Sequence, residues 1–265
     1  MTIRAADDLD MTSIEQRLRG LGVRIGLPVH GTAETGSTNE DAMRAGEQGA
    51  VHGALFLADG QRAGRGRLGR TWYSPRGQNL YMSVLLRPAG DVRNLASITI
   101  VAGLAVAQAA QRFLPAGAVG IKWPNDVVVG SKKLAGILVE ASTTQARVDH
   151  IVVGIGINVR QTEFDPAIAA IATSIAREAQ VAPSRLDVLA AVVERLGAHL
   201  DTFERSGLGP MLEAVRGLDV LRGKTVRVND VEGEADGIDE SGCLRVKTAS
   251  GAVVPIHAGE VKLVW

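Results

Sequence analysis

Short runs of apolar residues alternate with longer segments of helical periodicity along most of the chain. The short runs predict strands at residues 54–58, 79–86, 126–129, 134–140 and 149–159. Gly130-Ser131-Lys132 is a turn-prone link between two of these strands, with no helical segment beside it. Parallel neighbours need long crossover connections, so the pattern favours hairpins over a mostly parallel, doubly wound sheet.

Two segments carry the clearest helical signal. Residues 97–113 are rich in alanine, and in residues 184–206 the apolar side chains recur every three or four positions. Ser184 and Asp187 can cap the start of the second segment. We interpret its apolar stripe as part of the core rather than as a ligand surface.

The residues after Leu221 show a different sequence pattern, with short apolar runs and no long helical segment. They predict short strands at 224–228, 243–247, 252–256 and 261–264, separated by Glu232-Gly233, Ser241-Gly242 and Ser250-Gly251. This pattern is typical of a small β-barrel that closes on itself to hide its edges. We therefore expect two domains, residues 1–218 and residues 219–265, of which the second supports the first or docks a partner.

Composition narrows the function classes. Lys plus Arg and Asp plus Glu each total 29 in 265 residues, and zero net charge argues against a dedicated nucleic-acid binder while leaving room for a local basic site. Cys243 is the one cysteine, which fits a reducing compartment. The start of the sequence lacks the apolar region of a signal peptide, and the uncharged stretch 98–110 is shorter than the ~18–20 residues of a membrane span. We expect a soluble, cytoplasmic protein without membrane contact.

A loop rich in glycine and arginine is the first candidate for chemistry. Residues 64–70 hold three glycines and three arginines, so the backbone can approach an anion while guanidinium groups bind carboxylate or phosphate. The glycines match a dinucleotide-binding pattern, but Thr71–Gly77 cannot continue a helix, and no P-loop motif occurs. We expect a mobile lid; the alternative is a solvated surface loop.

A second candidate is Lys122-Trp123-Pro124-Asn125-Asp126, followed closely by Lys133 and Gly136. Asp126 could hold Mg²⁺, and Asn125 could bind a phosphate or the shell of the metal. The alternative is an ordinary turn, because Pro-Asn-Asp is common turn chemistry. Lys133 could neutralise charge that develops in acyl or phosphoryl transfer, and Gly136 leaves space for a flat ligand.

Smaller signals lie on either side of these motifs. Ser37 and Glu40 predict a capping box for a helix through Gln48, which is compatible with polar ligand contacts at the same place. Gly154 and Gly156 lie on one face of a predicted strand and open a slot beside it. The five histidines have no metal-ligand spacing, and no G-x-S-x-G elbow is present.

Taken together, these motifs resemble the biotin–protein ligase family, in order and spacing from Thr35 to Val159 and again in the β-rich tail. The resemblance implies an α/β (α+β) catalytic domain related to class II aminoacyl-tRNA synthetases, a mixed sheet flanked by helices, with an SH3-like C-terminal domain. It also implies a reaction in two steps. Biotin and ATP form biotinyl-5′-AMP and pyrophosphate, and a lysine of a biotin carboxyl carrier protein domain, part of a biotin-dependent carboxylase, then takes the biotin.

The resemblance also implies roles for residues of this sequence. It makes Lys133 and Arg67 catalytic and Asp126 the ligand of Mg²⁺. It places biotin against Ser37, Thr38, Asn39, Gln61, Gly64, Arg65, Gly66, Arg67, Lys133, Gly136, Gly154 and Gly156. It places ATP or the adenylate against Arg67, Arg70, Trp72, Asn125, Lys133 and Asn158.

One departure from the family pattern bears on DNA. Repressor members carry an N-terminal winged helix, whereas only 36 residues precede Ser37 here and they show no helix-turn-helix pair. We therefore expect a monofunctional ligase without DNA binding, and exposed strand edges would allow a homodimer. Two rival interpretations remain: a lipoate–protein ligase, and a non-catalytic nucleotide- or RNA-binding module. Aromatic residues, at 3%, are too sparse to favour RNA recognition by base stacking.

Overall fold

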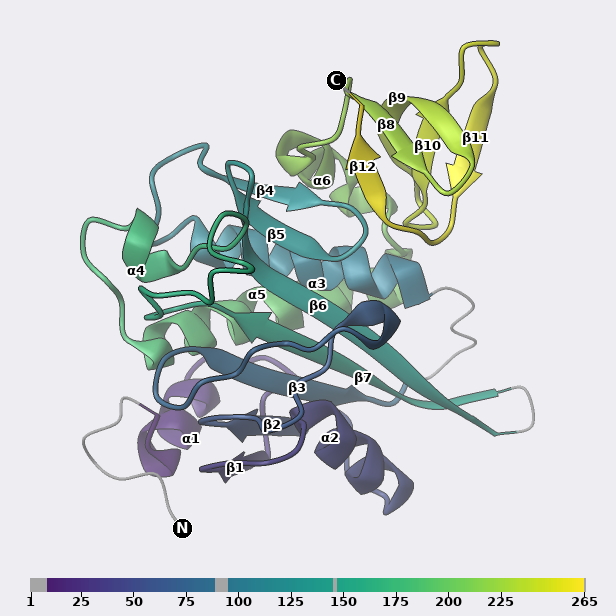
Figure 1. Cartoon of the computed structure of the whole chain (residues 1–265). Helices are drawn as coiled ribbons and strands as arrows, with labels where there is room; N and C mark the ends of the chain where they lie inside the picture. The colour runs from purple at the N-terminus through teal and green to yellow at the C-terminus, as the bar shows by residue number, and fades with distance from the viewer. Residues whose placement is uncertain (1–8, 89–94, 145–146, 265) are drawn as a thin grey trace.

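A computed structural model describes residues 9–88, 95–144 and 147–264 (Figure 1). Its larger sheet has the order β1-β2-β3-β7-β6-β5-β4. The strands are β1 (Val29–Thr32), β2 (Leu55–Ala58), β3 (Leu80–Leu86), β4 (Val119–Lys122), β5 (Asp126–Val129), β6 (Lys132–Thr144) and β7 (Arg147–Ile157). Among these strands, β1 and β2 pair in parallel and the other neighbours pair antiparallel. The predicted hairpins and mixed sheet are therefore confirmed.

Helices cover both faces of this sheet. They are α1 (Met11–Arg19), α2 (Thr38–Glu47), α3 (Leu95–Ala110), α4 (Ile175–Glu178), α5 (Arg185–Ser206) and α6 (Leu212–Leu218). In Figure 1, α2 lies in front of the sheet and α3 and α5 lie behind it. The two long helices match the predicted segments, and the Ser184 hydroxyl accepts a hydrogen bond from the backbone N–H of Asp187, as expected of the cap. Every helix in the described part of the chain is too short or too polar to span a bilayer.

The core lies on both sides of the sheet because side chains of a strand point alternately to its two faces. Phe56, Leu85 and Val152 pack under α2, while their strand neighbours belong to the larger cluster that includes α3 and α5. Every residue of β3 is buried. This explains why the strand reads as a nearly continuous apolar run with one polar position, Ser83.

The C-terminal domain is a five-stranded antiparallel sheet of order β11-β10-β9-β8-β12. The strands are β8 (Thr225–Val228), β9 (Val231–Ile238), β10 (Leu244–Lys247), β11 (Val253–Ile256) and β12 (Val261–Leu263). Strand β9 was not predicted: Glu232-Gly233 lies inside it rather than between strands. The turn is at Asn229-Asp230, where Asn229 takes a positive φ of 52°. Glycines within β9 hid its alternation.

The two sheets are in contact. Trp123, buried just after β4, donates from its indole nitrogen to the carbonyl of Gly242 at 2.9 Å. The backbone N–H of Val220 bonds the carbonyl of Ile121 at 3.0 Å, so the chain leaving α6 runs beside β4. The C-terminal domain therefore sits over the end of the large sheet that carries the Lys122–Asp126 motif (Figure 1). The boundary between residues 218 and 219 stays a prediction.

Candidate active site

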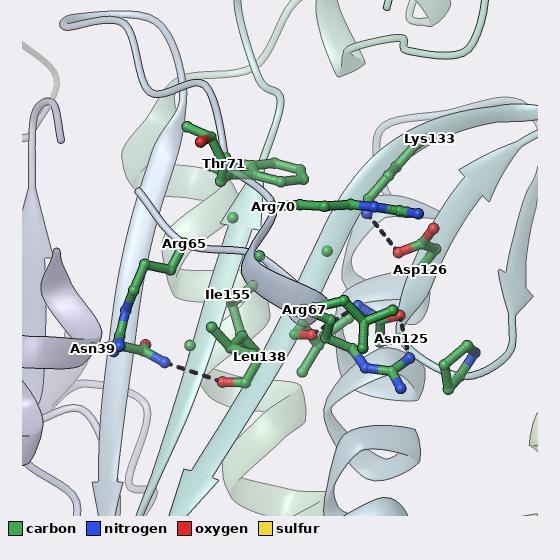
Figure 2. Close-up of a pocket in the computed structure, with 18 of the residues that line it drawn as sticks. Asn39, Arg65, Arg67, Arg70, Thr71, Asn125, Asp126, Lys133, Leu138 and Ile155 are labelled. Carbon is green, nitrogen blue, oxygen red and sulfur yellow. Dashed lines mark hydrogen bonds and ion pairs between the residues drawn. The ribbon is translucent and has the colours of Figure 1, made fainter. Parts of the chain in front are cut away.

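One open pocket brings together nearly all of the residues singled out by the sequence. It lies where the N-terminus of α2, the arginine-rich loop, the ends of β5, β6 and β7 and the C-terminal domain meet (Figure 2). Predicted residues that line it are Ser37, Thr38, Asn39, Gln61, Arg65, Gly66, Arg67, Arg70, Trp72, Asn125, Asp126, Lys133, Gly136, Gly154 and Gly156. The strands place these side chains together although they are far apart in sequence.

Gly64 and Asn158 are the two predicted residues that do not line the pocket. Gly64 lies in the loop, where an added Cβ would collide with the Trp72 carbonyl oxygen. Asn158 is buried, and its side-chain amide donates to the carbonyl of Thr173 at 2.9 Å. In this structure both residues shape the backbone around the pocket rather than its surface.

The α2 end of the pocket holds a chain of uncharged hydrogen-bonding groups. Gln61 Oε1 accepts from the backbone N–H of Thr38 at 2.9 Å, and Gln61 Nε2 donates to the Ser74 hydroxyl at 2.9 Å. The hydroxyl of Ser83 lies 2.8 Å from Thr38 Oγ1 and 2.6 Å from Asn39 Oδ1. These bonds fix the orientation of donors and acceptors before any ligand arrives.

The predicted capping box at Ser37 is wrong in its bonding. Helix α2 does begin at Thr38, but the Ser37 side chain makes no capping hydrogen bond. One free N–H of the first turn, that of Thr38, is instead bonded from outside the helix by Gln61. A residue 23 positions away therefore holds the start of α2, where the local sequence pointed to Ser37.

Glycines on β6 and β7 form a flat floor. Gly136 and Gly156 are direct partners across the two strands. A Cβ at Gly156 would lie 2.5 Å from the ring of Trp72, and one at Gly154 would collide with Asn39 Oδ1. The predicted slot therefore exists, and the side chains of Trp72 and Asn39 occupy it from above.

Four of the cationic side chains that line the pocket were predicted, and each has a polar partner: Arg67, Arg70 and Lys133 lie at the other end, whereas Arg65 reaches back to the α2 end. Lys133 Nζ pairs with Asp126 Oδ1 at 2.6 Å and lies 5.2 Å from the centre of the Trp72 ring. Arg67 donates to Asn125 Oδ1 at 3.2 Å (Figure 2). Burial lowers the pKa of the Arg67 guanidinium, which nevertheless stays charged at neutral pH.

The other two cations, Arg65 and Arg70, bind carboxylates that were not among the predicted site residues. Arg65 donates to Glu140 Oε2 at 2.8 Å, and Arg70 donates to Glu260 Oε2 at 2.7 Å. Glu140 also accepts from the side chain of Asn39 at 2.7 Å. A charged residue at the end of the apolar run in β6 could have pointed to Glu140, whereas no local signal marks Glu260 because it lies in the other domain.

The arginine-rich loop is tied by its own backbone. The N–H of Gly66 donates to the carbonyl of Arg70 at 2.7 Å, and the N–H of Trp72 donates to the carbonyl of Gly64 at 2.8 Å. A short 3₁₀ turn, Arg67–Gly69, forms the tip, with Leu68 exposed. No dinucleotide-binding helix follows in this described segment, as expected. Closure of this loop over a ligand stays a prediction.

Comparisons with known proteins agree with this architecture. Residues 35–158 match the model of the biotin/lipoate A/B protein ligase family, and residues 222–264 match that of the biotin protein ligase C-terminal domain. The biotin–[acetyl-CoA-carboxylase] ligase of Paracoccus denitrificans is 37% identical over 86% of this chain and 98% of its own length. The chain belongs to the biotin–protein ligase family.

Further similarities place this ligase within that family. The bifunctional ligase/repressor BirA of Escherichia coli is 33% identical over 86% of this chain and 71% of its own length. The structure of the biotin protein ligase from Aquifex aeolicus in complex with biotin and ATP has a TM-score of 0.78 and 32% identity, covering 90% of this chain and 99% of that one. The family and fold expected from the sequence are confirmed.

Proposed function

We propose that this ligase joins biotin to a lysine of a biotin carboxyl carrier protein domain in two steps that consume ATP. The observation that carries the proposal is one pocket with two chemically different ends. Thr38, Asn39 and Gln61 offer fixed hydrogen bonds at one end, and Arg67 and Lys133 offer positive charge at the other. Biotin has a matching division, with an uncharged ureido head and a carboxylate tail.

In the first step, a carboxylate oxygen of biotin attacks the α-phosphorus of ATP, and the bond from that phosphorus to the pyrophosphate oxygen breaks. Both reactants are anions, so they meet only where cations offset their repulsion. Arg67 and Arg70 of the arginine-rich loop and Lys133 of β6 supply these charges. Trp72 then borders the nucleotide, and Asn125 Oδ1, once released by Arg67, accepts a hydrogen bond from it.

In the second step, the neutral amine of the acceptor lysine attacks the carbonyl carbon of the adenylate. The bond from this carbon to the phosphate oxygen breaks, AMP leaves, and the amine loses a proton as the amide forms. The mixed anhydride must be kept from water until the acceptor arrives, which gives the arginine-rich loop its function as a cover. We propose that Arg65 and Arg67 hold this loop on the adenylate.

Mg²⁺ fits this pocket only together with ATP. Asp126 is one carboxylate on the pocket wall, and the described residues contain no group of three or more metal-ligating side chains. Mg²⁺ is commonly bound by one or two carboxylates together with substrate phosphates, so Asp126 would hold the ion alongside ATP. The ion would then share the negative charge of the phosphates.

We further propose that this ligase acts in the cytoplasm and does not bind operator DNA. The net charge is zero, and a single helix, α1, occurs in the described residues 9–36, so these hold no helix-turn-helix pair. Strand β1 is one edge of the large sheet, and pairing along it would permit a homodimer, whereas the chain that leaves α6 covers the other edge, β4.

Pyrophosphate exchange tests the activity. The purified chain with ATP and labelled pyrophosphate should incorporate label into ATP when biotin is present, and not with lipoate. A carrier domain incubated with the chain, ATP and biotin should gain the mass of one biotinyl group on its lysine. Exchange with lipoate would favour the lipoate ligase interpretation, and binding of nucleotide without exchange would favour the non-catalytic one.

A further inference from the structure

The arginine-rich loop is the tip of a longer ladder formed by residues 59–77, which we call the loop ladder. Its base closes where the N–H of Gly77 bonds Asp59, at 3.3 Å to the carbonyl and 3.1 Å to Oδ1. The next bond runs from the N–H of Gln61 to the carbonyl of Ser74 at 3.2 Å. The base of the ladder therefore determines where Gln61 and the arginines lie.

A fully buried arginine holds this base. Arg185, the first residue of α5, donates from Nη1 to Asp59 Oδ1 at 2.7 Å. The same nitrogen lies 3.4 Å from the carbonyl oxygen of Asn79, just beyond the other foot of the ladder. Asp59 is itself only 4% exposed. One guanidinium thus contacts both ends of the segment that carries the loop.

Local structure gives no reason for a cation at this place. Positive charge is unfavourable at a helix N-terminus, and a buried ion pair is weak evidence for stability because both charges lose their water. Neither Asp59 nor Arg185 lines the pocket. The geometry of the pair, rather than stability or ligand contact, is what distinguishes this site.

We propose that Arg185, through Asp59, is a positioning residue for the ligase reaction. The pair fixes the feet of the loop ladder, so the arginine tip returns to one closed position over the adenylate. This inference rests on the proposed function, because it assumes that the loop covers biotinyl-AMP. Closure with misplaced feet would leave gaps through which the adenylate escapes before an acceptor arrives.

The double variant Asp59→Asn/Arg185→Met tests this proposal. It removes both charges together, so no buried charge is left alone, and the new amide oxygen at position 59 can still accept from Gly77. Arg185→Lys is the second variant, which keeps the charge but carries it on a shorter, non-planar group that cannot reproduce the placement of Nη1 between Asp59 and Asn79. Leu200→Ala, a buried position on the same helix away from the loop, provides a matched loss of stability.

The readout is the partition of biotinyl-AMP between release into solution and transfer to a carrier domain. We expect release to rise by about 10-fold in the double variant, less in Arg185→Lys, and not at all in Leu200→Ala. With the adenylate bound, cleavage by trypsin after Arg65 and Arg67 should remain fast in the double variant and become slow in Leu200→Ala.

The possible outcomes distinguish the positioning role of Arg185 from the proposed ligase function. If the parent chain makes biotinyl-AMP and the folded variants partition it as Leu200→Ala does, the positioning role is wrong and the function stands. If Arg185→Lys alone folds, an unchanged partition in it overturns the role equally. If the parent chain makes no adenylate from biotin and ATP, both the function and the inference fail.

Discussion

Single side chains in the pocket are held by partners that a ligand must replace. Lys133 is paired with Asp126, and Arg67 with Asn125. Such pairing keeps the cations in position in the pocket and reduces the cost of ordering them on binding. The chemistry of these residues was readable from the sequence, because lysine, arginine and asparagine beside glycines point to anion binding. Their partners were not, because ion pairs are formed by the fold.

Replacement of Lys133 by alanine should lower the rate of biotinyl-AMP formation by on the order of 10² or more, since a charge-stabilising donor is lost. Pyrophosphate exchange measures the rate. Lys132→Ala, the adjacent lysine that does not line the pocket, is the control and should stay near the parent rate. Near-normal exchange in Lys133→Ala would remove Lys133 from the catalytic role.

Replacement of Gly156 by alanine should raise the KM for biotin by about 10-fold, because the new methyl group projects from the floor of the pocket, where biotin is proposed to lie. Gly103→Ala is the matched control: its nearest neighbour is 4.0 Å away, and alanine favours the helix. Initial rates over a range of biotin concentrations give the KM values. Equal KM values for biotin in the two variants would show that Gly156 is not part of the biotin-binding surface.

Secondary-structure elements were predicted where periodicity was strong and missed where they were short, as α1, α4, α6, β1 and β4 were, or where glycine concealed the pattern. Helix α5 follows its apolar stripe and cap closely. Strand β9 was missed because Gly233 and Gly237 interrupt its pattern, where their small size suits a tightly curved sheet. The arginine-rich loop was recognised as non-helical, but its backbone ladder depends on contacts between residues that local sequence rules do not pair.

The contact between α3 and α5 includes a group that titrates near neutral pH. His199 Nε2 lies 2.9 Å from Gln108 Oε1, and burial lowers the pKa of His199 below its ordinary value. The unfolded chain therefore binds a proton more readily than the folded one. The stability due to neutral His199 is present above the unfolded pKa of about 6.5 and is lost as pH falls toward the folded pKa.

The free energy of unfolding of the parent chain should consequently fall more steeply between about pH 7 and 5 than that of His199→Gln. Urea denaturation at a series of pH values measures this slope, and the other histidines contribute equally to both proteins. Parallel curves for the two proteins would show that His199 does not titrate differently in the folded state.

At the scale of the whole molecule, the C-terminal domain completes the pocket. Gly259, Glu260 and Val261 lie on its wall, and Glu260 holds Arg70 across the domain boundary. The hydrogen bond from Arg70 lowers the pKa of Glu260, so the pair is intact at neutral pH and weakens only in acid as Glu260 is protonated. The small domain thus contributes to the site although it contains none of the predicted residues.

Glu260→Gln should raise the KM for ATP, because Arg70 is then less firmly held over the phosphates. The rise should be only about two- to fivefold, because the ion pair is exposed to solvent. Glu232→Gln, which removes an ion pair with Arg227 within the same domain, is the control and should leave the KM unchanged. The effect should shrink at high salt, which screens exposed charges. An unchanged KM at low salt would show that Arg70 acts without Glu260.

The sequence by itself determined the elements and the chemistry. Apolar periodicity specified strands and helices, and clustered glycine, arginine and lysine specified an anion site with its family. Only the tertiary structure decided the partners: Gln61 at the start of α2, Glu140 and Glu260 on the arginines, and Arg185 at the feet of the loop ladder. The reason is physical. Periodicity and residue type act over a few neighbouring positions, whereas these contacts join residues 23 to 190 positions apart and exist only after the chain has packed.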